Sequence, residues 1–339
     1  MKVEQGTAAA QADGKGNAAP PSLNRYAWAA LFAFTLAYPA AVSFDNYLLH
    51  VGITIAFNVA LAASMWLIWS LGLVSFAHAG FMAIGAYTSA LLLTKLGWPM
   101  WIGMPLGAIL AGAAAVAISL PLMRTRAVYF FMASWSVGEV IKRTIAYFDG
   151  LTGGWNGVFD ILPPTIDLGP IQINFADRIA YYYLAVVICA IIVLCIYRIN
   201  DSRTGMIHWS ISENELLAEH IGINVFKHKV IGFTIACVFA AVTGALYAHY
   251  QTFISPKSFD IWKSEFALVH IIVGGLTTVG GPVVGAISLT VIDETLRATG
   301  PFRVILFGVI LIATVLLLPG GLETIPGRIR RALRGRKSS

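Results

Sequence analysis

The stretch 47–69, YLLHVGITIAFNVALAASMWLIW, contains no Asp, Glu, Lys or Arg and is apolar along almost its whole length. A bilayer core takes roughly 20 such residues as one helix, so this stretch predicts a membrane-spanning helix. The whole chain has the same character, because 58% of its 339 residues are hydrophobic and only 12% are charged. Soluble proteins carry about 25% charged residues. The sequence therefore predicts an all-α polytopic membrane protein.

Similar apolar runs predict about ten transmembrane helices, or about eight if the two short runs flanking Gly280 do not cross. The chain would then consist of a disordered tail at 1–25, a transmembrane domain at 26–320 and a basic tail at 321–339. The first tail has too few large apolar side chains to fold. Two sets of five spans would form an inverted repeat, because five is odd. The expected spans are 26–42, 47–69, 76–96, 100–122, 127–148, 179–199, 230–253, 265–279, 283–296 and 304–318.

Lys and Arg favour the cytoplasmic side of a membrane, and this preference predicts the orientation. With both termini inside, 15 of the 23 basic residues fall in inner segments. The loop 149–178, with four Asp and one Arg, then lies outside. The basic segment 328–337, RIRRALRGRK, fits this pattern; it could instead bind anionic lipid or RNA. We expect both termini to be cytoplasmic, with membrane lipid but no nucleic acid as a partner.

The longest inner connection, 200–228, contains a charged segment that predicts a short helix of about nine residues. SENE at 212–215 has the pattern of a capping box, in which Ser212 and Glu215 cap each other's backbone amides. Gly222 can take the left-handed conformation that ends a helix. The helix would have an apolar flank that either folds back onto the membrane domain or the lipid interface, or docks into a cytoplasmic protein. That flank consists of Leu216, Leu217 and Ile221.

Two regions rich in small residues, 75–85 and 274–285, would let helices approach closely or break. A membrane tolerates a break only where the backbone faces protein or a water-filled path. His78 could line such a path or pack between helices. The candidate pathway or helix-break residues are Ser75, His78, Gly80, Gly85, Gly274, Gly275, Gly280, Gly281 and Pro282.

Charged residues inside the expected spans need partners or a cavity. Glu139 is expected to pair with Lys142 and Arg143, or else to face a cavity. Asp293 is expected to pair with Arg297, four residues further along the same helix.

The sequence contains no pattern of a catalytic or metal site. HExxH and GxSxG are absent, as is the ATP-binding motif GxxxxGK[ST]. Cysteines 189, 195 and 237 lie in apolar runs without a CxxC or Cys/His pairing, so neither a metal site nor a disulfide framework is expected. An ion-coupled secondary transporter would typically have acidic residues at mid-membrane, whereas the acidic residues here lie near span ends. We expect a transport protein without enzymatic activity of its own.

Four stretches of the sequence resemble those of a known family of transport proteins. They are LGLVSFAHAGFMAIGAYTSALL (71–92), LTGGWNGV (151–158), ENELLAEHIGINVFKHK (213–229), and GALYAHYQTFISPKSF (244–259) followed by VGGLTTVGGPVVGA (273–286). In order and spacing they resemble the LivM family of ATP-binding-cassette (ABC) importer permeases for branched-chain amino acids. The resemblance covers nearly all of residues 48–319 and leaves out the N-terminal tail.

The resemblance implies a permease subunit in a bacterial inner membrane, working with a sister permease, two ABC ATPases and an extracytoplasmic binding protein. ATP and Mg would be bound by the ATPases and no cofactor by this chain. Whether the two permeases are identical is left open. The outer-loop residues Gly153, Gly154 and Asn156 would meet the binding protein or cover the pathway. The residues implied in coupling to an ATPase are Glu213, Asn214, Glu215, Leu216, Leu217 and Gly222.

The expected substrates are branched-chain or other hydrophobic amino acids. Relatives of the family that handle urea, amides or aromatic acids provide an alternative, and an ion-coupled secondary transporter is a second one. No residue in the sequence chooses among the substrates on chemical grounds.

Overall fold

The computed structural model describes residues 35–41, 45–125, 127–167, 172–318 and 320–324. The N-terminal tail at 1–25, most of the first expected span and most of the basic C-terminal tail lie outside these residues. Residues 35–41 are helical. Within the described part, six helices of 19 to 27 residues form the body of the molecule. They are α3 (Asn46–Trp69), α4 (His78–Leu96), α5 (Met100–Leu122), α6 (Ala127–Tyr147), α8 (Arg178–Asn200) and α11 (Val225–Gln251).

Five of these six helices, all except α6, are long and apolar enough to cross a membrane. The last three expected spans coincide with α12 (Trp262–Gly274), α13 (Gly280–Leu296) and α14 (Arg303–Leu317), which have 13, 17 and 15 residues. Each is shorter than the roughly 20 residues that a bilayer core needs. The helical membrane fold is therefore confirmed, whereas the number ten and the inverted repeat are still predictions.

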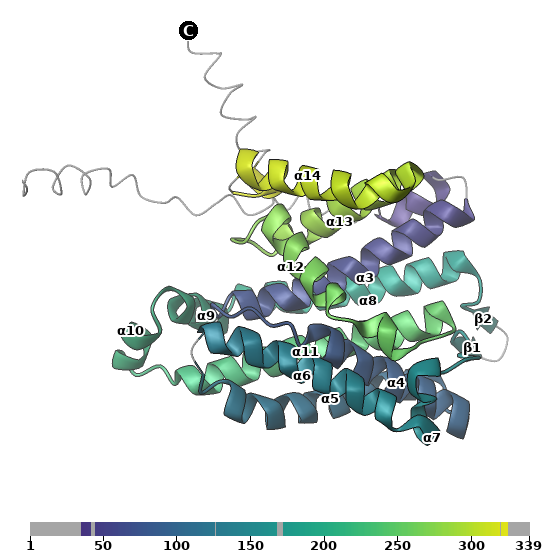
Figure 1. Cartoon of the computed structure of the whole chain (residues 1–339), viewed down its shortest axis with the longest axis horizontal. Coiled ribbons are helices and arrows are strands. Elements are labelled where there is room, and N and C mark those ends of the chain that lie inside the picture. The colour runs from purple at the N-terminus through teal and green to yellow at the C-terminus, as the bar shows by residue number, and fades with distance from the viewer. Residues whose placement is uncertain (1–34, 42–44, 126, 168–171, 319, 325–339) are drawn as a thin grey trace, which may run out of the picture.

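Short elements lie at the two ends of the helix bundle. Figure 1 shows α9 and α10 at one end and the strands β1 and β2 at the other. The strands pair antiparallel, with Ile166 opposite Ile173, and are a small departure from the expected all-α fold. The short elements are α7 (Asp149–Thr152), α9 (Arg203–Glu213), α10 (Glu215–His220), β1 (Thr165–Asp167), β2 (Gln172–Asn174) and the 3₁₀ turns η1 (Gly154–Asn156), η2 (Pro256–Phe259), η3 (Arg297–Phe302) and η4 (Leu322–Thr324).

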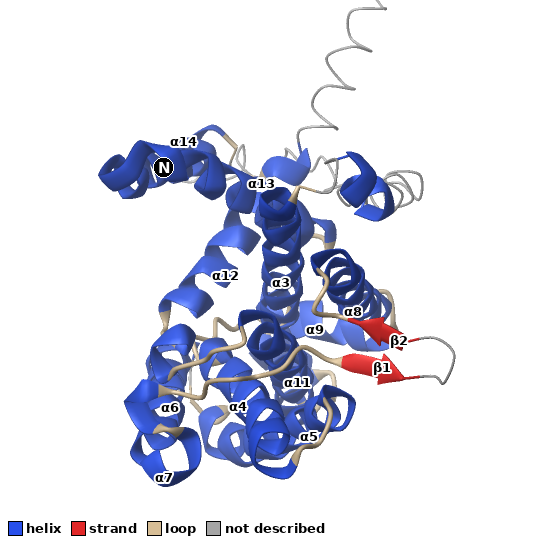
Figure 2. Cartoon of the chain, turned by 90° about the vertical axis from the view of Figure 1, so that its right-hand side faces the viewer, coloured by secondary structure: helices blue, strands red, loops and turns tan. Residues whose placement is uncertain are grey.

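Helix α3 is the centre of the fold. In the end-on view of Figure 2 it lies among α8, α11, α12 and α13, and it packs against all four. Its side chains Ile53, Trp66 and Ile68 are completely buried. The Trp66 indole N–H donates to the Leu276 carbonyl oxygen, 3.0 Å away, in the connection between α12 and α13. The stretch 47–69 is therefore the core helix of the protein.

Glycines bring two pairs of helices into backbone contact. A β-carbon at Gly85 of α4 would collide with the Ala241 carbonyl oxygen of α11, and one at Gly244 of α11 would collide with the Met82 carbonyl oxygen. Gly281 of α13 meets the Gly275 carbonyl oxygen in the same way. Because the obstacle is backbone, a larger side chain cannot be accommodated by a change of rotamer. Close helix approach, one of the two roles expected for the small residues, is thus observed.

The break between α12 and α13 is closed by residues that follow α14. The hydroxyls of Thr277 and Thr278 both donate to the Glu323 carboxylate. Gly275 has a φ of 133°, and Gly321 packs directly against it. Residues 320–324 are therefore a structural part of the α12–α13 turn.

Candidate functional site

The connection 200–228 forms two consecutive helices rather than one. Helix α9 begins after Ser202, whose hydroxyl accepts a hydrogen bond from the Thr204 amide. Asn214 has an extended backbone, ends α9 and caps α10, where its side-chain oxygen accepts from the Leu217 amide at 3.0 Å. Helix α10 has six residues, three fewer than the expected nine.

The predicted capping box is wrong. Ser212 lies in the last turn of α9, and its hydroxyl donates to the Trp209 carbonyl oxygen at 2.8 Å. In a capping box, the Ser212 hydroxyl would accept a hydrogen bond from the Glu215 amide. In the structure α10 begins at Glu215, and its N-terminal cap is the Asn214 side chain. The Glu215 carboxylate turns instead to Lys229 of α11, 2.7 Å away.

The predicted end of the helix at Gly222 is confirmed. Gly222 has a φ of 88°, and its amide donates to the Glu219 carbonyl oxygen at 2.9 Å. The Ile223 amide donates to the Ala218 carbonyl oxygen at 3.1 Å. These two bonds are the pair that defines a Schellman motif. Both ends of α10 are therefore specified by residues within the segment.

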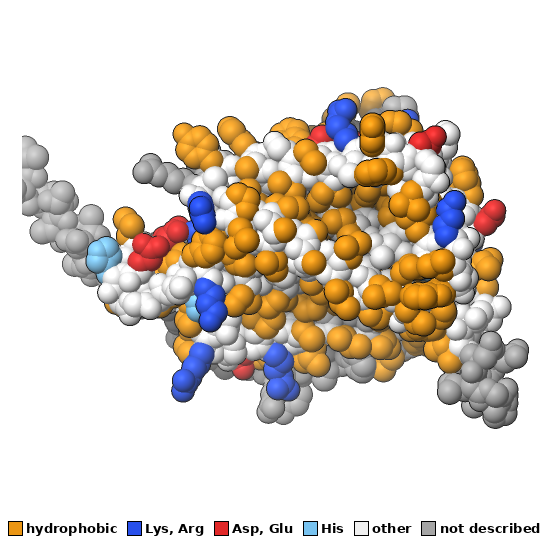
Figure 3. Space-filling view, turned by 90° about the horizontal axis from the view of Figure 1, so that it is seen from below, with side chains coloured by type: hydrophobic (Ala, Val, Ile, Leu, Met, Phe, Trp, Pro, Cys, Tyr) orange, Lys and Arg blue, Asp and Glu red, His pale blue; other side chains and the backbone are white. Residues whose placement is uncertain are grey.

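Helix α10 is held to the rest of the molecule on one side only. Ala218 is buried, and the Lys229 side chain that pairs with Glu215 is 5% exposed. Leu216, Leu217 and Ile221 are 67%, 62% and 68% exposed. The apolar flank therefore does not fold back onto the described part of the chain. Figure 1 shows α10 projecting from the end of the bundle, and Figure 3 shows charged side chains at this end and at the opposite end, with a broad hydrophobic surface between them.

Helix α9 packs against α10 and joins it to the helix bundle. Its His208 is buried, 3.5 Å from the Ser70 hydroxyl at the end of α3. Burial, together with the nearby His228, lowers the pKa of His208 to about 4, so the imidazole is neutral at neutral pH. The Trp209 indole N–H donates to the Asn200 side chain at 3.0 Å. Helix α9 thereby connects α10 to both α3 and α8.

Replacing Glu215 with Gln is expected to loosen α10. Gln has the same size but leaves the buried Lys229 ammonium without its anion. Breaking a buried ion pair costs roughly 3–5 kcal/mol, and the half-exposed position of Glu215 should reduce this to about 1–2 kcal/mol. Hydrogen exchange of the α10 amides should then become about fivefold to thirtyfold faster. Glu219→Gln is the matched control, since Glu219 is exposed and forms no ion pair within the described residues. Equal exchange in the two variants would show that the ion pair does not hold α10.

The candidate pathway residues are tightly packed. Ser75 and His78 are completely buried, and Gly80 lies against Gly138 of α6. His78 is completely buried, and neither of its ring nitrogens has a hydrogen-bond partner among the described residues, so the hydrogen bond across helices expected for a packing role is not observed. In the second region Gly274, Gly280, Gly281 and Pro282 are buried, and Gly274 contacts the Gly281 carbonyl oxygen. Gly80 borders a void of only about 10 Å³.

Two serines that sequence reasoning missed stabilise the start of α4. Ser264 of α12 accepts from the Ala79 amide at 2.9 Å and donates to the Phe76 carbonyl oxygen at 3.0 Å. Ser134 of α6 accepts from the Phe76 amide at 3.1 Å. Both serines are completely buried. The helix break at 70–77 therefore faces protein, with its polar groups bonded to neighbouring helices.

The loop segment 151–158 is bonded to the end of α11. Gly153, Gly154 and Gly157 all have positive φ values, of 72°, 56° and 83°. Val158 forms a β-bridge with Ile254 just beyond α11. Trp155 and Asn156 are exposed between these fixed points. The loop thus presents a rigid turn at the end of the molecule opposite α10.

The predicted ion pairs of Glu139 are confirmed, and the predicted pair of Asp293 with Arg297 is wrong. Glu139 pairs with Lys142 at 2.7 Å and with Arg143 at 2.8 Å, and Lys142 also reaches Asp260 at 3.0 Å. Asp293 pairs with Arg303 of α14 instead of Arg297.

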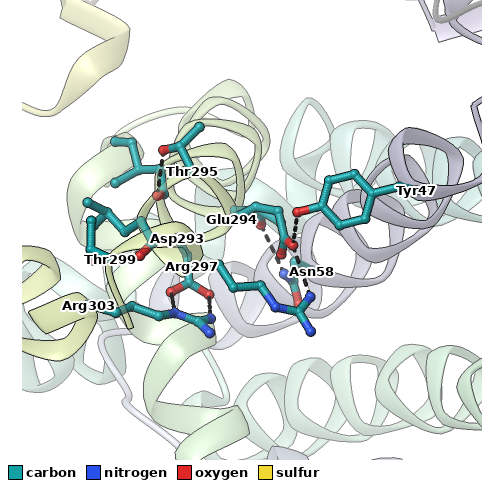
Figure 4. Close-up of polar contacts among 11 residues, drawn as sticks. Tyr47, Asn58, Asp293, Glu294, Thr295, Arg297, Thr299 and Arg303 are labelled. Atoms are coloured by element: carbon teal, nitrogen blue, oxygen red, sulfur yellow. Dashed lines mark hydrogen bonds and ion pairs between the residues drawn. The ribbon is translucent and has the colours of Figure 1, made fainter. Parts of the chain in front are cut away.

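The change of partner follows from the end of α13. The helix stops at Leu296, and η3, with Gly300 at a φ of 59°, turns the chain so that Arg303 lies over Asp293. Arg297 pairs with Glu294 at 3.1 Å, and Glu294 also accepts from the Tyr47 hydroxyl of α3. Figure 4 shows these contacts, together with the 3.0 Å hydrogen bond from Asn58 to Thr290 in the same helix pair. Polar contacts thus hold α13 to both α3 and α14.

Comparison with known proteins gives a consistent result. Residues 47–316 match the model of the family described as branched-chain amino acid transport system / permease component. The chain is 26% identical to the high-affinity branched-chain amino acid transport system permease protein LivM of Escherichia coli K12, over 86% of this chain and 73% of LivM. It is 23% identical to LivH of the same strain, over 74% of this chain and 86% of LivH.

A relative with a different named substrate also matches. The guanosine ABC transporter permease protein NupQ of Bacillus subtilis 168 is 28% identical over 52% of this chain and 59% of NupQ. No solved structure matches the chain significantly.

Proposed function

Because the chain belongs to the permease component family of branched-chain amino acid transport systems, we propose that it imports branched-chain or other hydrophobic amino acids as one permease of an ABC importer. It is a transport subunit and a multi-pass inner-membrane protein. The match to LivM over most of both chains supports amino acids as the substrate class. The match to the guanosine permease covers about half of the chain and supports a nucleoside less strongly.

The observation that best supports this function is the exposed apolar flank of α10. Three large apolar side chains project from a short helix that is capped at both ends and tied to α11 by an ion pair. In water such a flank needs a partner. We assign it to an ABC ATPase, which would supply ATP and Mg, neither of which this chain is expected to bind. The further partners are a sister permease, a second ATPase and an extracytoplasmic binding protein.

The packing offers a route by which movement of α10 would reach the membrane domain. The Glu215–Lys229 pair joins α10 to α11, and α11 contacts α4 backbone to backbone at Gly85 and Gly244. A rigid-body shift of α10 on ATP binding would therefore be passed to α11 and α4 together. The pathway would alternate as this pair moves against the rest, with α10 on the cytoplasmic side and the loop 149–178 outside.

Co-purification tests the assignment directly. Tagged full-length protein, solubilised from its native membranes, is expected to bring down an ATPase that carries the GxxxxGK[ST] motif. Purified complex in liposomes should then take up labelled leucine only when ATP is supplied. Purification without any ATPase would contradict the importer. Copurification with an ATPase combined with ATP-driven uptake of guanosine, but not of leucine, would contradict the proposed substrate alone.

A further inference from the structure

A cavity of about 860 Å³ lies between α3, α8 and α13, next to residues 35 and 38. It follows α8 from Tyr182 to Arg198, a rise of roughly 24 Å. Its volume lies within the range of about 300–1,000 Å³ found for small-molecule pockets. Leu194 and Tyr197, which border it, are exposed, so the cavity opens as a groove on the surface of α8. None of the nine candidate pathway residues borders this groove.

The walls of the groove are apolar, and most of them belong to α3 and α8, two helices that are long and apolar enough to cross a membrane. They include Ile55 and Val59 of α3, Val186 and Val193 of α8, and Ile287 of α13. At one end Tyr38 and Tyr182 stack with ring centroids 5.5 Å apart. Their hydroxyls donate to the carbonyl oxygens of Leu48 and Thr35. The rings therefore close this end as apolar surface, and the groove matches a hydrocarbon chain.

The other end of the groove, next to α9, is charged. Its lining ends with Arg198 and Asp201, both of which are exposed. The two residues are close in sequence, yet within the described part of the chain neither forms an ion pair. The groove thus ends in one cation and one anion that are three residues apart in the sequence.

We propose that this groove binds a phospholipid whose headgroup carries a phosphate and a primary ammonium, namely phosphatidylethanolamine. An acyl chain lies along α8, the Arg198 guanidinium binds the phosphate through two N–H donors, and the Asp201 carboxylate accepts from the ammonium. Basic pockets between transmembrane helices are known sites for lipid headgroups. The charge pair selects this headgroup, because phosphatidylglycerol offers no cation to Asp201 and phosphatidylcholine has no N–H to donate.

The lipid site does not depend on the proposed transport function. It rests on the shape of the groove and on two charged side chains at its end. Binding can therefore be measured on the purified full-length chain without substrate, ATP or partner subunits.

Native mass spectrometry of the detergent-solubilised chain, titrated with each of the three lipids, tests the proposal. Phosphatidylethanolamine is expected to bind about tenfold more tightly than phosphatidylglycerol or phosphatidylcholine, the difference that one hydrogen bond between charged groups provides. Asp201→Asn should remove the preference over phosphatidylglycerol, and Arg198→Gln should weaken the binding of all three lipids. These exposed substitutions leave the helix packing unchanged.

Filling the groove provides a second measurement. Ala190 borders the groove, so Ala190→Trp should lower the bound phosphatidylethanolamine about tenfold. Ile191→Trp is the matched control, because Ile191 is 53% exposed and does not border the groove. Equal affinity of the wild type for the three lipids would overturn the proposal, as would equal retention in the two Trp variants. Absence of saturable binding would also overturn it.

Discussion

Replacing Leu216 and Leu217 of α10 together with aspartate will abolish ATP-driven uptake while leaving the protein inserted in the membrane. The two leucines are 67% and 62% exposed, so the change removes no contact within the described chain. A buried apolar contact with an ATPase would be replaced by two unpaired carboxylates. Hot-spot contacts of this kind cost about 2–4 kcal/mol each, so the affinity for the ATPase should fall at least about a thousandfold. Uptake by reconstituted complex and recovery of the ATPase on tagged permease are the measurements.

Met206→Asp is the matched control for this double variant. Met206 lies on α9, is 64% exposed and is an apolar residue of the same connection. If α10 is the docking element, this variant keeps its ATPase and its uptake. Normal uptake by the α10 double variant would exclude the docking role. Loss of uptake in both variants would assign the contact to the whole connection rather than to α10.

Replacing Gly85 with Ala will strongly destabilise the membrane domain. The new β-carbon would collide with the Ala241 carbonyl oxygen, which belongs to the helix backbone and cannot move alone. Overpacking of a core costs about 1–3 kcal/mol and occasionally more, and a backbone obstacle favours the upper end. We expect the midpoint of thermal unfolding to fall by roughly 6–12 °C, taking about 2–4 °C per kcal/mol. Loss of the monodisperse peak after heating, followed by fluorescence-detected size exclusion, measures this.

Gly308→Ala separates this collision from the general effect of changing a membrane glycine. Gly308 lies within α14, and nothing lies within 4 Å of a β-carbon placed there. Alanine is the better helix former by about 1 kcal/mol, so the control should unfold at the same temperature as the wild type or higher. A Gly85→Ala protein as stable as the Gly308→Ala protein would mean that α4 and α11 can separate at little cost.

The number of apolar runs and their positions could be predicted from the sequence because bilayer thickness imposes a length on each helix. All nine expected runs from 47–69 onwards coincide with a helix. That helices approach each other closely at glycines could also be predicted, because only a residue without a side chain permits such close approach. The partner of each glycine could not, because Ala241 is 156 residues from Gly85 and no local pattern connects them.

Predictions from short sequence patterns were wrong where a helix ended earlier or later than the pattern implied. The capping-box pattern at 212–215 is a local signal, and it does not register that Ser212 still belongs to α9. Asn214 has an equally good capping side chain and an extended backbone. The Asp293–Arg297 pair assumed that α13 continued past Leu296, where the chain instead turns towards Arg303. The Glu215–Lys229 pair and the groove along α8 depend on tertiary packing and leave no signal in the sequence.

The contact of Glu323 with Thr277 and Thr278 has a consequence for how the protein is made. The turn between α12 and α13 is complete only when Glu323, 46 residues after Thr277, is in place. A bacterial ribosome adds roughly 5–20 residues per second, so the turn stays open for roughly 2–9 s of synthesis. During that time its glycine-rich backbone is exposed to the insertion machinery and to proteases. In a chain terminated before Glu323, Thr277 and Thr278 would lack this carboxylate acceptor, and the turn would stay open.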